Sequence, residues 1–232
     1  MLVVLEVSDT LQSLDLNDQV YGTLREWLMT GRLSPGERLS QHQVAATLGV
    51  SRSPVHHALT RLASDGLVSV RPRRGYFVTP LTPKVVQDAY DVRLALELMV
   101  AERTVARIAD ADIERLRSLL MDTYPAAGMD AAAMDPRVWH RANQTFHEFQ
   151  INLARNSVLS DVFRSLNVNL LMERILRGAG GRWLRDVTEE HTAIVYAYER
   201  GDLPGARLAL RRHNETSRKI AAEAIARAGG TA

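Results

Sequence analysis

The stretch from Ser40 to Val78 constrains the fold of this chain most, because it carries the signals of two helices and a hairpin in order. Residues 40–48 place apolar side chains on one helical face, and Gly49 follows where a positive φ ends a helix. Residues 51–64 repeat this pattern behind capping serines. Two short β-prone runs between residues 67 and 79 then flank an arginine-rich turn. This order predicts a winged helix-turn-helix.

Basic charge gathers in the same stretch. Between Ser51 and Pro80 there are five arginines and one acid, whereas the whole chain has a formal net charge of +2. Arg52 begins the second helix, the end that enters the major groove, where a guanidinium can bind guanine O6 and N7. The wing arginines would contact phosphates. Double-stranded DNA is the predicted partner; the alternative is a solvated basic face.

The run VSRSPVHHALTRLASDGLV, followed by RRGYFV, resembles the DNA-binding domain of GntR-family bacterial transcription regulators over about residues 17–80. PGERL at Pro35–Leu39 matches the segment just upstream in that family. The family usually has Arg-Glu after Pro-Val, where this chain has His56-His57. The resemblance implies a DNA-contacting set made of Arg38, His42, Ser51, Arg52, Ser53, His56, Arg73, Arg74 and Gly75.

The rest of the sequence narrows the class of protein. The absence of cysteine excludes disulfides and thiolate metal sites, and no apolar run approaches the roughly 20 residues of a membrane span. The N-terminus lacks the features of a secretory signal, so we expect a soluble, cytoplasmic protein without a membrane partner. Residues 1–16 are expected to form a flexible arm ahead of a supporting helix at 19–31.

Prolines around residues 79–83 mark a domain boundary, which gives a DNA-binding domain at 1–80 and a second domain at 81–232. The second domain follows a helical period throughout, so the predicted fold class is mainly α: a winged helix-turn-helix, with a small β-hairpin wing, followed by an all-α bundle. Linkers are expected at 125–133 and 178–181. The six predicted helices cover 84–107, a segment from Asp110, 136–154, 156–176, 183–200 and 204–227.

Three runs of the second domain, DVRLALE, FHEFQINLARN and EHTAIVYAYERGD, resemble the FCD effector domain of the FadR-type subfamily, in its shorter VanR-like variant. The resemblance implies a homodimer that binds a divalent metal and a small organic acid, a carboxylate, inside the bundle. Because two-fold proteins match two-fold sites, a dimer predicts a short palindromic operator.

Three histidines, His147, His191 and His213, occupy the metal positions of that family, with Asn143 where the family usually has Asp. Asn143 and His147 are one helical turn apart, and an antiparallel pair of final helices would bring the other two together. Zn²⁺ is the favoured ion, with Ni²⁺ or Mn²⁺ as alternatives. Each histidine could instead be a hydrogen-bonded core residue, as we expect for His140.

Arg93 lies one turn before Glu97 and has two interpretations. It either binds the carboxylate of an effector or forms an ordinary i,i+4 ion pair with Glu97. Both interpretations stay open at the level of sequence.

The leading function is a ligand-responsive transcription regulator, and specifically a repressor. The alternative is a metal-dependent enzyme that uses the three histidines. Glu148 and Glu190 are next to ligand histidines in sequence, but adjacent helical positions point about 100° apart, so neither is placed as a general base. A constitutive architectural DNA-binding protein is a third class, which would need no buried polar site.

Overall fold

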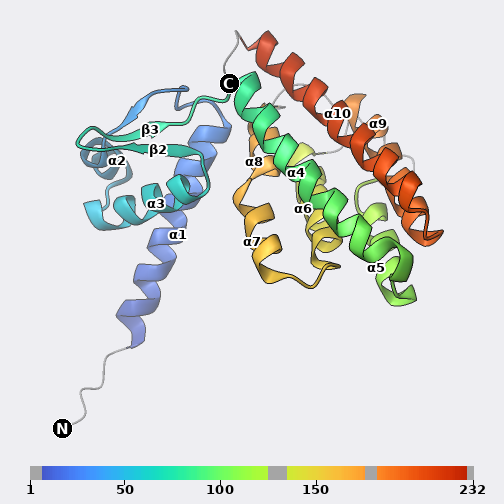
Figure 1. Ribbon diagram of the computed structural model, residues 1–232. Helices are drawn as coiled ribbons and strands as arrows, with labels where there is room; N and C mark the ends of the chain where they lie inside the picture. The colour runs from blue at the N-terminus through green and yellow to red at the C-terminus, as the bar shows by residue number, and fades with distance from the viewer. Residues whose placement is uncertain (1–6, 125–134, 176–181, 229–232) are drawn as a thin grey trace. The chain divides into compact units, whose positions relative to one another are not determined.

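The computed structural model describes residues 7–124, 135–175 and 182–228, and the chain divides into two compact units between Pro80 and Leu81. The first unit is a helix-turn-helix with a small antiparallel sheet, and the second is helical (Figure 1). The predicted fold class, mainly α with an N-terminal winged helix-turn-helix, is therefore confirmed.

Local sequence signals set the ends of the helices in the first unit. The Ser40 side chain caps the second helix by accepting a hydrogen bond from the Gln43 backbone N–H, and Gly49 ends it with φ 66°. The third helix buries Val55 and Leu59 completely, and it packs against the first. The three helices are α1 (Val7–Met29), α2 (Gln41–Leu48) and α3 (Arg52–Ser64).

The wing is a three-stranded antiparallel sheet with the order β1-β3-β2. The predicted hairpin is present, but each strand is shifted by one residue from its expected bounds of 67–70 and 76–79, with Val68 paired to Val78 and Arg71 paired to Gly75. Sequence analysis did not predict the short strand that adds to the far edge of the hairpin, because two residues show no alternation. The strands are β1 (Arg38–Leu39), β2 (Val68–Arg71) and β3 (Gly75–Val78).

In the second unit, caps again begin the helices where the sequence suggested. The Thr82 side chain accepts from the Val85 backbone N–H, and Asp202 accepts from the Gly205 backbone N–H at 2.9 Å. The elements are α4 (Pro83–Thr104), the 3-10 turn η1 (Val105–Arg107), α5 (Asp110–Met121), α6 (Pro136–Asn152), α7 (Ser157–Ser165), α8 (Val168–Ile175), α9 (Arg182–Glu199) and α10 (Leu203–Arg227).

Two expectations about helices were wrong. The first helix begins at Val7 and not at residue 19, so part of the expected flexible arm is helical. The helix expected at 156–176 is two helices, because Asn167 adopts φ 48°, a left-handed conformation that Asn tolerates better than most residues. The described part of this unit therefore has seven α-helices where six were expected. The linkers expected at 125–133 and 178–181 lie outside the described residues.

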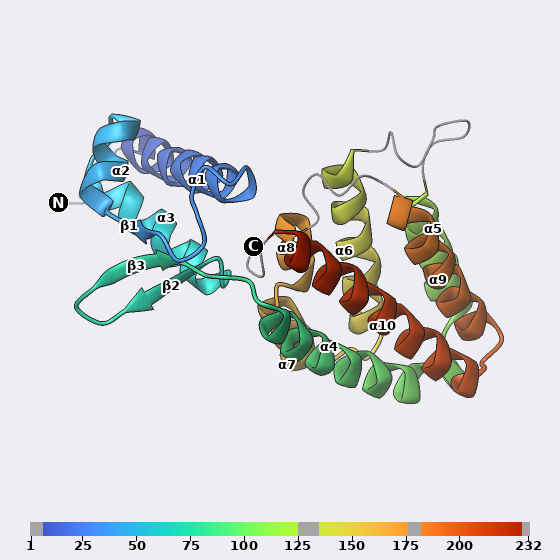
Figure 2. The same ribbon diagram turned by 90° about the horizontal axis from the view of Figure 1, so that it is seen from above.

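The helices of the second unit close around a common interior (Figure 2). α10 contacts α4 and α9, α5 contacts α9 and α6, and α6 contacts α4. Phe146 on α6, Ile194 on α9 and Leu210 on α10 are completely buried in one core cluster. The inner faces of α4, α6, α9 and α10 therefore meet inside the bundle.

Among the described residues, no helix is both long and apolar enough to cross a membrane.

Candidate functional site

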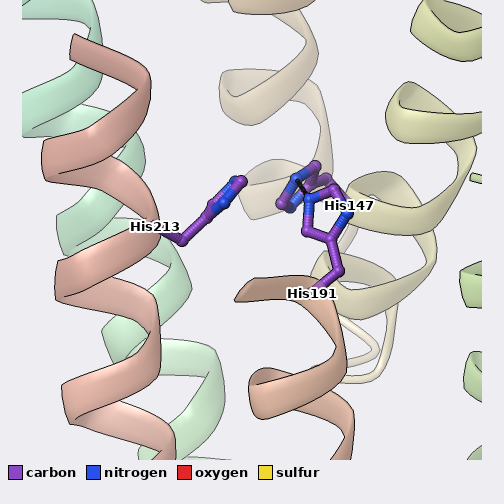
Figure 3. Close-up of side chains that lie close together, drawn as sticks. All are labelled: His147, His191 and His213. Atoms are coloured by element: carbon purple, nitrogen blue, oxygen red, sulfur yellow. Dashed lines mark hydrogen bonds between the residues drawn. The ribbon is translucent and has the colours of Figure 1, made fainter. Parts of the chain in front are cut away.

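Three imidazoles from three helices meet in the interior of the second unit (Figure 3). His147 comes from α6, His191 from α9 and His213 from α10, and each is at most 1% exposed. One ring nitrogen from each lies within 4.8 Å of the others, and the Nε2 atoms of His147 and His191 are 3.1 Å apart. The structure thus brings together three of the four residues predicted to bind metal.

The local fold explains this meeting. α9 and α10 are joined by a tight turn at Gly201, which has φ 62°, so the two helices run back along each other. This antiparallel pair carries His191 and His213 on facing sides. α6 supplies the third imidazole from elsewhere in the sequence, and its ring centroid is 5.0 Å from each of the other two.

Two buried carboxylates lie behind these imidazoles. Glu97 Oε1 is 3.1 Å from His147 Nδ1, and Glu190 Oε2 is 3.4 Å from His213 Nδ1. A carboxylate this close to Nδ1 favours a proton on that nitrogen, which would leave the Nε2 lone pair for a metal ion. Glu190 contacts the outer nitrogen of its histidine, which agrees with a position behind the site. The sequence did not indicate this role for Glu97, whose spacing from Arg93 suggested only an ion pair.

Arg93 and Glu97 do form an ion pair, but it is buried. Arg93 Nε donates to Glu97 Oε1 at 2.9 Å, and the side chains are 2% and 0% exposed. A guanidinium nitrogen of Arg93 also lies 3.5 Å from His213 Nε2. The two sequence interpretations therefore do not exclude each other, because the paired arginine also reaches the histidine cluster.

Burial sets the charge of these groups. It lowers the pKa of His147 to about 3, with the Arg93 guanidinium acting in the same direction, and it lowers the pKa of His191 and His213 as well. Burial alone would raise the pKa of Glu97, but Arg93 and His147 outweigh it and lower this pKa to about 2. At neutral pH the site therefore combines neutral imidazoles with a charged carboxylate.

This donor set fits a divalent metal ion. If each imidazole carries its proton on Nδ1, the Nε2 atoms of His147 and His191, which are 3.1 Å apart, cannot hydrogen-bond each other, and His213 Nε2 has Arg93 Nη2 at 3.5 Å. A cation between them would satisfy all three lone pairs, and three nitrogen ligands plus open positions suit Zn²⁺. The residues that would hold it are His147, His191 and His213.

A small cavity adjoins the cluster, with a volume of about 10 Å³, which is room for about one water molecule. Asn143, the fourth predicted metal residue, borders this cavity and is 5% exposed. Its polar lining residues are Arg93, Asn143, His213 and Ser217, and its apolar and aromatic lining residues are Tyr90, Trp139, Met172, Trp183, Val187 and Ile220.

The remaining polar candidates lie apart from the cluster. His140 packs its ring edge-to-face on Trp139 at 5.3 Å, and burial lowers its pKa to about 4. Neither of its ring nitrogens has a hydrogen-bond partner within the described segments. Glu148 accepts from Gln144 on the exposed side of α6. His140 was expected to be a hydrogen-bonded residue, and the described contacts do not include such a bond.

In the first unit, the residues predicted to contact DNA are at the surface. They are distributed over β1, α2, α3 and the wing. All have exposed side chains except Gly75, which is partly buried, and the set is Arg38, His42, Ser51, Arg52, Ser53, His56, Arg73, Arg74 and Gly75.

His56 is held by neighbours from two other elements. Its Nδ1 lies 3.2 Å from Gln41 Nε2 on α2 and 3.2 Å from the Tyr76 hydroxyl on β3. The Gln41 amide nitrogen can only donate, so Nδ1 accepts and the proton lies on Nε2. The histidine that replaces the usual arginine thus offers one oriented donor at the surface. Sequence analysis did not identify Gln41 or Tyr76 as its partners.

Comparison with known proteins follows the same division of the chain. The family described as bacterial regulatory proteins, gntR family, matches residues 16–78, and the FCD domain matches residues 88–216. The HTH-type transcriptional regulator YdhC of Bacillus subtilis is 31% identical, over 76% of this chain and 77% of its own length. The HTH-type transcriptional repressor RspR of Escherichia coli K12 is 25% identical, over 90% of this chain and 91% of its own length. The solved structure of E. coli McbR/YncC has a TM-score of 0.69 at 26% identity, covering 90% of this chain and 97% of that one.

Proposed function

This chain belongs to the GntR family of bacterial transcription regulators and carries an FCD domain, and on that premise we propose that it is a repressor whose helical unit binds a divalent metal ion and a small organic acid. It is a transcription regulator and not an enzyme, because its relatives are regulators over most of their length. The observation that carries the proposal is the convergence of three buried imidazoles inside the unit that matches the FCD domain.

We assign DNA binding to residues 1–80, and effector binding and dimerisation to residues 81–232. The two family matches fall on either side of Pro80, as do the two compact units. Binding of the acid in the helical unit would change how a dimer presents its two recognition helices. An architectural DNA-binding protein would not need the buried polar site. An operator affinity that stays the same with and without metal and acid would therefore favour that alternative.

The metal proposal is tested by calorimetry on protein stripped with EDTA. We expect one Zn²⁺ per chain, with Ni²⁺ and Mn²⁺ as comparisons, because nitrogen ligands favour Zn²⁺ and Ni²⁺ over Mn²⁺. When bound, the ion would supply a positive charge that attracts a carboxylate. Stripped protein that takes up none of the three ions would contradict the proposal.

The exposed arginine at the start of α3 is proposed to read bases. Arg52→Ala is expected to weaken specific operator binding by about 1–3 kcal/mol and to relax sequence preference, because a guanidinium can bond guanine at two atoms. Arg74→Ala in the wing is the comparison: it should weaken binding to all DNA and lower the salt slope by about one. Binding sites selected from random duplexes with the full-length protein provide the measurement. Unchanged selectivity in Arg52→Ala would contradict this docking.

We expect a homodimer on a short palindromic operator, because a single winged helix reads too few base pairs for useful selectivity. Light scattering of the protein alone and with its selected duplex measures the assembly. A monomer under both conditions would overturn this part of the proposal.

Asn143 is proposed to face the metal from one turn before His147. With four neutral ligands a divalent ion keeps its full charge, so metal and acid should bind cooperatively. Asn143→Asp adds a charged oxygen ligand, and we expect tighter metal binding and weaker acid binding. Calorimetry with Zn²⁺, with and without the acid, measures both affinities. If both affinities stay as in the wild type, Asn143 is not a ligand.

A further inference from the structure

We infer that the organic acid is a small monocarboxylate with an apolar body, bound with its carboxylate at the histidines and Arg93 and its body against Trp139 and Trp183. This inference rests on the proposed function, because it takes a divalent ion at the histidine cluster as given. Beyond the proposed function, it specifies the charge and the shape of the ligand.

The charges around the cluster favour a single negative charge on the ligand. Arg93 contributes +1, Glu97 and Glu190 contribute −1 each, and the three imidazoles are neutral. Adding a divalent ion leaves the buried group at +1, so a monoanion makes it neutral and a dianion makes it negative. Uncompensated charge is costly in a buried site. Arg212 is 3.7 Å from Glu190 but 78% exposed, so solvent screens it.

Arg93 fixes where the carboxylate would bind. Its Nε is engaged with Glu97, but its Nη2 reaches within 3.5 Å of His213 Nε2, the face that the metal would share. Two cations this close inside a protein need an anion between them. A carboxylate from the ligand can accept from the guanidinium and take an open position on the metal.

The apolar and aromatic part of the lining favours an apolar body. It is formed by Tyr90, Trp139, Met172, Trp183, Val187 and Ile220. The two indole rings meet edge-to-face at 4.8 Å and make a right-angled corner. Their N–H groups, which have no partner among the described residues, could bind a neutral oxygen but cannot compensate a second negative charge. Among the described residues that line the cavity, only Arg93 carries a permanent positive charge, so a second carboxylate would meet no cation of its own there.

The volume limits the size of the ligand. The cavity of about 10 Å³ holds no organic acid until a wall moves. Met172 is unbranched and adaptable, and Trp183 is partly exposed, so these two side chains can shift where the fully buried walls cannot. Binding should therefore change the environment of an indole, which gives an optical signal.

Butyrate and succinate test the inference, because both have four carbons and they differ by one carboxylate. Trp27→Phe removes the tryptophan of the first unit, so that fluorescence reports on Trp139 and Trp183. With Zn²⁺ bound, we expect butyrate to bind about tenfold or more tighter than succinate, because an unpaired buried carboxylate is penalised. Calorimetry on the same samples gives the Zn²⁺ stoichiometry and both affinities.

Ile220→Arg adds a cation to the apolar wall at a partly exposed position, with Ile220→Leu as its control. The arginine variant is expected to reverse the preference toward succinate, and the leucine variant to keep the preference for butyrate. Should the arginine variant not fold, the wild-type comparison remains decisive.

The possible outcomes distinguish failure of the proposed function from failure of this inference alone. Failure to bind Zn²⁺ would overturn the proposed function, and this inference with it. Zn²⁺ binding combined with no response to butyrate, or with succinate binding as tightly as butyrate, would overturn only the inference. A folded Ile220→Arg protein with the wild-type preference would contradict the placement of the body.

Discussion

Replacing Glu97 by alanine is expected to lower the free energy of unfolding of the helical unit by about 3–5 kcal/mol, because it leaves Arg93 buried without its anion. Arg93 is 2% exposed, so water cannot replace the lost carboxylate. Urea unfolding of full-length protein with EDTA, followed by tryptophan fluorescence in a Trp27→Phe background, reports on the helical unit alone.

The matched control removes both charges. Arg93→Met combined with Glu97→Leu is expected to recover most of the loss, because replacing a buried ion pair by apolar residues of similar volume is often close to neutral. A Glu97→Ala protein that loses less than about 1 kcal/mol would mean that Arg93 finds another partner or reaches solvent. If the double variant is as unstable as Glu97→Ala, the loss of stability would come from the lost contact between Glu97 and His147, and not from the unpaired Arg93.

His191→Ala is expected to weaken Zn²⁺ binding by more than about 100-fold, because losing even an outer partner of a ligand costs 10–100-fold and this change removes a ligand itself. His191 is completely buried and its Nε2 lies 3.1 Å from that of His147. Competition against a chromophoric chelator measures the affinity.

His140→Ala is the control for that experiment. His140 is also a buried histidine of the same unit, packed on the same tryptophan, but it is not a member of the three-nitrogen cluster. Its loss should leave Zn²⁺ affinity unchanged. Equal affinities in wild type, His140→Ala and His191→Ala would show that the cluster is a polar core and not a metal site.

The parts of the fold that could be predicted from sequence are those with local causes. Ser40 and Gly49 bracket α2, and Thr82 and Asp202 cap α4 and α10, through contacts within a few residues. The histidine cluster could be anticipated because the resemblance fixed its positions. The break at Asn167 was missed because asparagine tolerates both helical and left-handed conformations, and only packing selects between them.

The missed features of the site have tertiary causes. Arg93 and Glu97 have the spacing of a surface ion pair, and only burial by the surrounding helices makes them part of the histidine cluster. The hydrogen bonds of His56 join three elements that are distant in sequence, through Gln41 and Tyr76. No local sequence pattern predicts such contacts. Strand β1 exists only because β3 offers it an edge to pair with.

The tight turn at Gly201 has a consequence for the chain entropy of the helical unit. Because α9 and α10 are already paired by this turn, a metal ion adds little constraint between His191 and His213. The connection from His147 to His191 spans 44 residues and contains α7 and α8. In the folded protein a metal ion would therefore tie this long connection to the paired helices α9 and α10, at an entropic cost that rises only slowly with the length of the connection.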